Sequence, residues 1–176
     1  MKKFRKLLKS PIKFFVDSRG VRKIINICVG YKDKQYPKPI ALMFRFSPWK
    51  KFIDDFFSNY SLIYLDFKRD DNRNINHYRN VIEQFKNKTI FIWGYKEPHG
   101  TSEYCRNNKI KLFRVEDGFL RSVHLGAEKS QPISLCIDSK GLYFDATKAS
   151  DLEDILNKYD FKNDRELLEK ARICKK

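Results

Sequence analysis

Two adjacent carboxylic acids, Glu116 and Asp117, follow a short apolar stretch within the segment "RVEDGFLRS" (residues 114–122). Gly118 comes next, and Arg121 follows shortly after it. A carboxylate in such a position can act as a nucleophile or as a general base, and an arginine nearby can hold an anionic group of a substrate. The segment is therefore a candidate site for chemistry on an anionic substrate.

A structural interpretation of the same residues stays open on spacing alone. In that interpretation Asp117 caps a turn, and Glu116 forms an ion pair with Arg114 or Arg121. His124 lies close by and has the chemistry of an acid or base, but a single histidine in an apolar loop more often has a structural role. Gly118 is expected to let the backbone turn sharply after the acid pair.

The composition limits the classes of protein and partner. The chain has 176 residues, 41% of them hydrophobic, which is enough for one domain with a core. Lys and Arg number 37 against 22 Asp and Glu, and the net charge of +15 favours anionic partners such as nucleic acid, an anionic membrane or an acidic substrate.

Several kinds of site have no sequence support. The cysteines form no CxxC pair and the histidines are scattered, so we expect buried thiols in a reducing compartment and no metal site. The chain also lacks the glycine-rich loops GxGxxG and GxxxxGKS that bind nucleotide phosphates.

The elements that must position the acid pair alternate between strand and helix. Apolar runs predict strands at 40–46, 61–67, 89–94 and 110–115. Helical spacing predicts helices at 47–60, capped by Ser47, and at 75–87 and 100–108. This alternation predicts an α/β fold with a Rossmann-like parallel sheet and helices on both faces. Ligands bind beyond the carboxyl ends of such strands, which is where Glu116 and Asp117 are expected.

The pattern changes after residue 130. The segments "SLCID" and "GLYFD" predict a C-terminal β-hairpin that turns at Ser139 and Lys140. The segment "SDLE" (150–153) has the pattern of a capping box and predicts a helix through Leu156. A last helix is expected in "NDRELLEKARICKK", which ends the chain.

The first twenty residues form a separate basic segment. Apolar and basic residues alternate at roughly helical spacing in 1–20, so the segment can lie on an anionic membrane or pack on the domain that we expect at 21–176. The segment lacks the features of a signal peptide, and no run approaches the roughly 20 apolar residues of a membrane span. We therefore expect a cytoplasmic protein.

The stretch from Phe91 to Leu156 contains four segments in order: "FIWGYKEP", "FRVEDGFLRSVHLGA", "QPISLCIDSKGLYFDAT" and "SDLEDIL". Together they resemble the bacterial capsule polysaccharide synthesis family. KpsC-type proteins of this family are retaining β-Kdo glycosyltransferases that build a Kdo linker on a phosphatidylglycerol-type lipid. His124 and Ala149 depart from the family pattern, which usually has glycine and often has proline at these positions.

The resemblance implies a fold and a chemistry. The family is similar in fold to GT-B glycosyltransferases, and the Glu-Asp-Gly element resembles a motif of bacterial sialyltransferases, which also use CMP-activated acidic sugars. By this resemblance Asp117 is the catalytic carboxylate and Glu116 a second catalytic residue. Arg121 and Ser122 hold the substrate or orient Asp117. CMP-Kdo is the donor substrate, and no further cofactor is implied.

The resemblance also implies partners and a location. We expect a lipid-linked glycan acceptor, an anionic membrane surface and other capsule assembly proteins as partners, and no nucleic acid. The expected location is the cytoplasm, peripheral to the inner membrane. Family members are much longer, so we expect one half of a GT-B enzyme, truncated before the donor-binding domain.

Two alternatives to the transferase remain. One is a non-catalytic polysaccharide- or lipid-binding protein that assists capsule synthesis or polysaccharide transport, and the other is a basic nucleic-acid-binding domain. Whether this chain is active alone is left open by the sequence, because a catalytic carboxylate needs a positioned donor.

Overall fold

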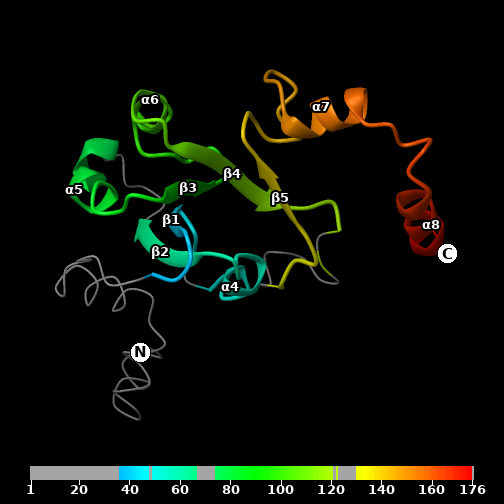
Figure 1. Ribbon diagram of the computed structural model, residues 1–176, viewed down its shortest axis with the longest axis horizontal. Helices are drawn as coiled ribbons and strands as arrows, with labels where there is room; N and C mark the ends of the chain where they lie inside the picture. The colour runs from blue at the N-terminus through cyan, green and yellow to red at the C-terminus, as the bar shows by residue number, and fades with distance from the viewer. Residues whose placement is uncertain (1–35, 48, 67–73, 121, 123–129, 176) are drawn as a thin grey trace, which may run out of the picture.

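A five-stranded sheet forms the centre of the computed structural model, which describes residues 36–47, 49–66, 74–120, 122 and 130–175 (Figure 1). The strand order is β2-β1-β3-β4-β5. Their bounds are Ile40–Phe44 (β1), Ser61–Asp66 (β2), Lys88–Trp93 (β3), Lys111–Asp117 (β4) and Leu135–Asp138 (β5). The predicted strands are therefore confirmed, with shifts of one or two residues at their ends.

The first four strands are parallel, and β5 runs antiparallel to β4. The strand order changes between β1 and β3. After β1 the chain forms β2 on one side of β1, and it then forms β3 on the other side. All five residues of β1 are buried, as expected for a strand that is covered on both faces. The predicted α/β fold with a Rossmann-like sheet is confirmed.

Helices cover the sheet on both faces. On one face, α4 (Ile53–Phe56) contributes to an apolar cluster with residues of β1, β3 and β4, including Met43, Phe91 and Val115. On the other face lie a 3₁₀ helix, η1 (Ile75–Tyr78), and two helices, α5 (Arg79–Ile82) and α6 (Thr101–Asn107). Side chains alternate between the two faces along each strand, so β1 to β4 each contribute to both clusters.

Two helices are shorter than their sequence patterns predict. The helix expected at 47–60 is regular only in α4, and its N-cap residue is Phe52, without a side-chain cap, so the predicted cap at Ser47 is wrong. The helix expected at 75–87 begins as η1 and continues as α5 only to Ile82. Packing of aromatic side chains against the sheet, such as Phe57 on Phe91, accounts for the apolar periodicity without a long helix.

The predicted hairpin between "SLCID" and "GLYFD" is wrong. Strand β5 pairs with β4 instead, with Asp117 opposite Leu135. The carboxylate of Asp138 accepts the backbone N–H groups of Lys140 and Gly141, both at 2.8 Å, and this turn directs the chain away from the sheet. The second segment, which begins at Gly141, forms turns and no strand.

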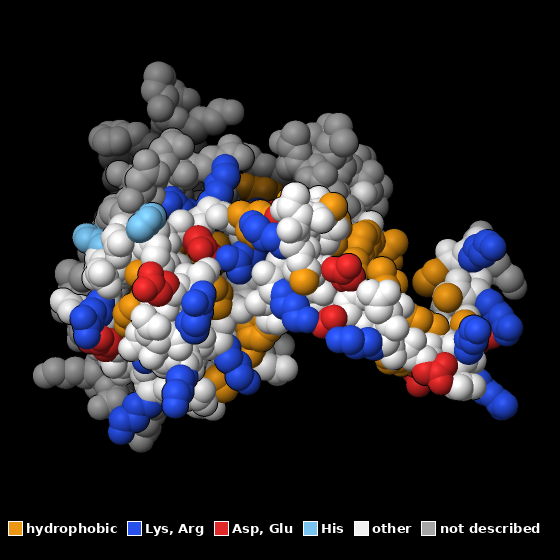
Figure 2. Space-filling model, turned by 90° about the horizontal axis from the view of Figure 1, so that it is seen from above, with side chains coloured by type: hydrophobic (Ala, Val, Ile, Leu, Met, Phe, Trp, Pro, Cys, Tyr) orange, Lys and Arg blue, Asp and Glu red, His pale blue; other side chains and the backbone are white. Residues whose placement is uncertain are grey.

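Two helices follow the turn, α7 (Asp151–Lys158) and α8 (Arg165–Cys174). The predicted capping box is confirmed, since the Ser150 hydroxyl accepts the N–H of Glu153 at 3.1 Å. Both helices lie beyond β5, away from the first four strands (Figure 1), and neither has a buried residue. Hydrophobic side chains reach the surface along them (Figure 2), among them Leu156, which is 62% exposed.

The expectations for the N-terminus fall outside the described residues. The basic segment 1–20 is not described, and the domain boundary at residue 21 stays a prediction. Within the described ranges, no helix has the length and apolar character that crossing a membrane requires. Basic side chains are spread over the face seen in Figure 2 and do not gather in one patch.

Candidate functional site

The acid pair lies at the carboxyl end of β4, as the sequence predicts. Strand β3 ends beside it at Trp93, and the N–H of Gly94 donates to the carbonyl of Val115 at 2.9 Å. Gly94 has a φ of 64°, which favours glycine, and a Cβ atom there would lie 3.4 Å from Oε2 of Glu116. The turn after β3 thus leaves space for the Glu116 carboxyl group.

Glu116 is partly buried, and its Oε1 atom accepts the backbone N–H of Asp117 at 3.1 Å. Burial raises the pKa of Glu116 above its ordinary value, and the neighbouring charge of Asp117 raises it further. The hydrogen bond from the Asp117 N–H and the charge of Lys50 act in the opposite direction on this pKa. A carboxyl group with a raised pKa is better suited to accept or donate a proton near neutral pH.

Asp117 faces the other side of the sheet, because successive strand residues point to opposite faces. Its side chain is 17% exposed, and its Oδ1 atom lies 3.9 Å from Nζ of Lys50. The Tyr143 hydroxyl donates to the backbone carbonyl of Asp117 at 3.1 Å. Asp117 is thus held at the rim of the sheet and still reaches solvent.

The structural interpretation offered Arg114 or Arg121 as the ion-pair partner of Glu116, and of these two only Arg114 is among the described residues. Arg114 donates to Oε2 of Glu97 at 2.6 Å and, at 3.4 Å, to the hydroxyl of Ser102, on the face of the sheet that carries α6. Its ion pair is with Glu97, so the predicted pairing of Glu116 with Arg114 is wrong. Arg121 lies outside the described residues, which leaves its predicted roles untested.

Sequence reasoning missed Lys50 at this site. Its side chain is only 9% exposed, and it reaches Asp117 from the connection between β1 and α4. The sequence "SPWKKF" gives no sign that Lys50 is buried while its neighbour Lys51 is exposed. The signal that could have located Lys50 is its position in the connection after β1, because β1 and β4 end at the same rim of the parallel sheet.

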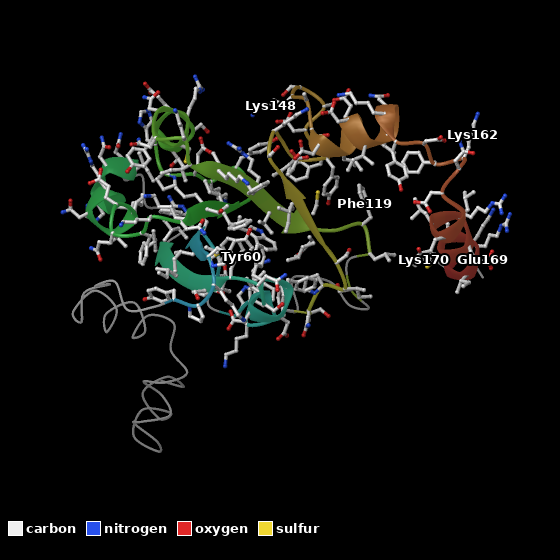
Figure 3. All side chains as sticks on the ribbon, viewed as in Figure 1. Tyr60, Phe119, Lys148, Lys162, Glu169 and Lys170 are labelled. Carbon is white, nitrogen blue, oxygen red and sulfur yellow. The ribbon has the colours of Figure 1, made fainter. Side chains whose placement is uncertain are left out.

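A surface groove of about 400 Å³ begins one residue beyond Asp117. It is lined by Gly118–Leu120, by Ser134 with strand β5, and by three residues of α7. Phe119 is 68% exposed and lies between the end of β4 and α7 (Figure 3). Neither Asp117 nor Ser122 lines this groove. Ser122 is partly buried.

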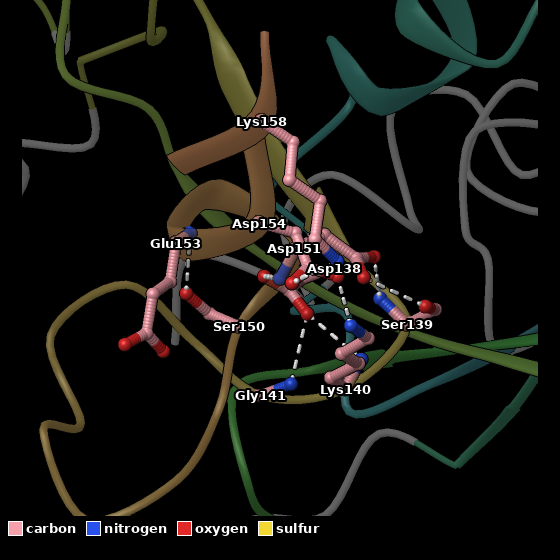
Figure 4. Close-up of polar contacts among 9 residues, drawn as sticks. All are labelled: Asp138, Ser139, Lys140, Gly141, Ser150, Asp151, Glu153, Asp154 and Lys158. Carbon is pink, nitrogen blue, oxygen red and sulfur yellow. Dashed lines mark hydrogen bonds and ion pairs between the residues drawn. The ribbon is translucent and has the colours of Figure 1, made fainter. Parts of the chain in front are cut away.

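The polar residues after β5 have structural partners. The Asp138 side chain, in a residue only 1% exposed, accepts the N–H of Asp151 at 2.8 Å in addition to its two contacts in the turn (Figure 4). Asp151 in turn accepts the backbone N–H of Ser139 at 2.6 Å. This network joins β5 to α7, so these polar residues position the helix. Other residues of the same segment lie beside the acid pair: Leu135 and Cys136 are opposite Asp117 and Glu116 on β5, and the Tyr143 hydroxyl donates to the Asp117 carbonyl.

Two glycines in the same segments are required by close packing. A Cβ atom on Gly118 would lie 2.3 Å from the Ser134 hydroxyl and 3.0 Å from the carbonyl carbon of Ser134. A Cβ atom on Gly141 would lie 2.6 Å from the carbonyl oxygen of Ala149. Gly118 does not have a positive φ, so close approach, and not the predicted sharp turn, explains the glycine there.

The described residues include no group of three or more His, Cys, Asp or Glu side chains arranged to hold a metal ion. Cys105, Cys136 and Cys174 are free thiols, and burial raises the pKa of Cys105 to about 12. Cys28 and His124 lie outside the described ranges.

Comparison with known proteins identifies the family. The sequence profile of the family described as "Capsule polysaccharide biosynthesis protein" matches residues 88–172, which run from β3 to α8 and include the acid pair. Residues 88–172 thus belong to this family of capsule polysaccharide biosynthesis proteins, and the resemblance drawn from the sequence is confirmed at that level.

Individual relatives agree. The lipopolysaccharide-processing protein LpsZ of Rhizobium meliloti is 36% identical over 138 residues, which is 78% of this chain and 30% of the relative. The capsule polysaccharide modification proteins LipA of two Neisseria meningitidis strains, of serogroups A and B, are 39% identical over 72 residues, 41% of this chain and 10% of each relative. The chain thus spans about a third or less of the length of these relatives.

Proposed function

We propose that this protein acts in capsule polysaccharide biosynthesis as a glycosyltransferase, or as part of one, that moves Kdo from CMP-Kdo to a lipid-linked acceptor with retention. The observation that carries the proposal is the acid pair at the carboxyl end of β4, inside the region that matches the family. Asp117 is partly exposed at this rim, and Glu116 has a raised pKa. The two carboxyl groups therefore have different environments, as separate catalytic roles require.

In the first step, a carboxylate oxygen of Asp117 attacks the anomeric carbon of Kdo. The bond from this carbon to the phosphate oxygen breaks, and CMP leaves with the electron pair. A carboxylate suits this step because it stabilises the positive charge that develops on the sugar ring. The product is a covalent glycosyl ester with inverted configuration.

In the second step, a hydroxyl oxygen of the acceptor attacks the same carbon, and the bond to Asp117 breaks. The second inversion restores the original configuration. The hydroxyl proton passes to a base, and the ionised form of Glu116 is the proposed acceptor, because its raised pKa makes it a stronger base than an ordinary glutamate. We propose that Arg121 and Ser122 hold the acidic sugar or orient Asp117.

The proposed setting is the cytoplasmic face of the inner membrane. The net charge of +15 supports an acidic donor, an acidic glycan and an anionic lipid surface as partners. Other capsule assembly proteins would supply the acceptor and use the product.

The test is Kdo transfer by the purified protein from CMP-Kdo to a synthetic lipid-linked Kdo acceptor. We expect Asp117→Asn to lower the rate by roughly 10³-fold or more while the far-ultraviolet circular dichroism spectrum is unchanged. The matched control is Asp55→Asn, the same chemical change at an exposed position of α4, which should leave the rate unchanged.

Two outcomes would contradict the proposal. One is an Asp117→Asn variant as active as the wild type. The other is a folded wild-type protein that transfers no Kdo and yet binds the glycan equally well with and without the Asp117 carboxylate, a result that favours a non-catalytic binding protein.

A further inference from the structure

Lys50 is a buried lysine at the proposed site. The residue is 7% exposed, although lysines are almost never fully buried unless they are paired. Its backbone is fixed on both sides, since its N–H donates to the carbonyl of Ser47 at 3.0 Å and its carbonyl accepts the N–H of Ile53 at 3.2 Å. The side chain is thus directed over the sheet by a short turn between β1 and α4.

Three aromatic rings surround the ammonium group of Lys50. Its Nζ atom lies 3.1 Å from the ring centroid of Trp93, 4.9 Å from that of Trp49 and 5.7 Å from that of Phe52. Contact with the face of an aromatic ring stabilises a cation, most strongly for tryptophan and away from water. The rings therefore fix the position of the charge near the end of β3.

Lys50 lies at the point in the sheet where the strand order changes. The lysine follows β1, Trp93 ends β3 and Asp117 ends β4, and these strands are neighbours in the sheet. Sheets of this type bind their ligands at such a change of order. Oδ1 of Asp117 lies 3.9 Å from Nζ of Lys50, so the cation connects the rim at β1 to the acid pair.

We propose that Lys50 is a positioning residue for the proposed transfer. Its ammonium group, which the aromatic rings keep in place, holds the Asp117 carboxylate at the rim of the sheet. The inference rests on the proposed function for its catalytic consequence. The contacts among Lys50, Trp93 and Asp117 are independent of that function.

The charge of Lys50 also acts on the second acid. It lowers the pKa of Glu116 and so opposes the effect of burial. The other groups that act on the pKa of Glu116 are Asp117 and Trp93. Glu116 in turn raises the pKa of Cys136, which lies opposite it on β5. Removal of the lysine charge therefore has a readout at Glu116 that a purely structural role would not produce.

The experiment compares Lys50→Met, Lys50→Arg and Lys51→Met. Methionine keeps much of the length and apolar volume of lysine and fits an aromatic environment, whereas arginine keeps the charge. Lys51→Met is the matched control, because it removes the same charge from the next, exposed residue. The titration midpoint of Glu116 is followed by carboxyl ¹³C chemical shift and assigned with Glu116→Gln.

We expect Lys50→Met to raise the Glu116 midpoint by about one pH unit, while Lys51→Met and Lys50→Arg leave it nearly unchanged. In the transfer assay we expect Lys50→Met to lower kcat about 100-fold with little change in KM, because a displaced carboxylate loses its alignment with the sugar. Lys50→Arg should recover part of this loss.

A Glu116 midpoint that is the same in Lys50→Met and Lys51→Met would overturn the inference, whatever the transfer assay shows. So would an unchanged kcat in Lys50→Met. If Lys50→Met does not fold, the wild-type protein gives the answer, because the ε-methylene protons of Lys50 must show the upfield shift of a group above an indole ring. A normal shift there contradicts the inference. If the midpoint moves as expected and the wild type transfers no Kdo, the proposed function fails and the pairing of Lys50 with the acids stands.

Discussion

Asp138, the last residue of β5, accepts the backbone N–H of Asp151, the first residue of α7, at 2.8 Å. The same carboxylate accepts two further backbone N–H groups in the turn that follows β5. A buried carboxylate is stable only when its oxygens are hydrogen-bonded, and here backbone N–H groups make all three of these hydrogen bonds. One side chain thus determines both where the sheet ends and where α7 begins.

Asp138→Ala should therefore destabilise the protein by about 3 kcal/mol, because it leaves buried backbone donors of the turn without an acceptor. Urea unfolding followed by circular dichroism measures the change. Asp55→Ala, an exposed acid on α4, serves as the control and should change the free energy of unfolding by less than about 0.5 kcal/mol. Equal effects of the two substitutions would mean that the network around Asp138 does not connect β5 to α7.

The fold could be predicted from the sequence where local patterns decide it. The strands β1 and β3 are apolar runs that the sheet buries on both faces, and β2 and β4 are apolar runs that it buries in part, so their composition locates all four. The capping box at Ser150 was equally visible. The alternation in "GLYFD" predicted a hairpin strand that does not form, because this pattern arises from separate contacts with distant residues. Leu142 is buried and donates its N–H to the Tyr95 hydroxyl, and Tyr143 reaches Asp117.

The candidate site was predictable in part for a related reason. The acid pair follows its strand directly, so the end of β4 and its chemistry are adjacent in the sequence. Lys50 reaches the pair only because β1 and β4 end at the same rim of the sheet, with β3 between them. The burial that makes this lysine unusual depends on Trp93 and Phe52, and no local pattern in "SPWKKF" reports it.

The ion pair between Arg114 and Glu97 should contribute more to stability than a surface pair of the same length. Both Arg114–Glu97 and Arg79–Glu83 have an N–O distance of 2.6 Å, but the side chains are 12% and 24% exposed in the first and 61% and 48% in the second. Burial removes water from the first pair, so loss of its acid leaves a poorly solvated guanidinium group. Exposed pairs contribute little.

We expect Glu97→Gln to lower the free energy of unfolding by about 2 kcal/mol and Glu83→Gln to have little effect. Both substitutions keep the size of the side chain and remove one charge, so they form a matched comparison. Thermal and urea unfolding measure the difference. A Glu97→Gln variant as stable as Glu83→Gln would show that the contacts of Arg114 with Ser102 and Tyr95 suffice to hold it.

Glu116 should make stability depend on pH in a direction opposite to that of most acids. Its pKa in the folded protein is raised above the ordinary value of 4.5, mainly by burial, so the folded state binds the proton more tightly than the unfolded chain does. Stability from this group is therefore present at low pH and is lost as the pH rises above 4.5 through the raised pKa of the folded state.

Glu116→Gln keeps an oxygen that accepts the Asp117 N–H and cannot ionise. The variant should be more stable than the wild type at pH 7, and the difference should shrink toward pH 4. Urea unfolding of both proteins across this range measures it, with Glu103→Gln, an exposed acid of α6, as the control. A constant difference between Glu116→Gln and the wild type at all pH values would contradict the assignment of a raised pKa to Glu116, and with it the role of proton acceptor proposed for this residue.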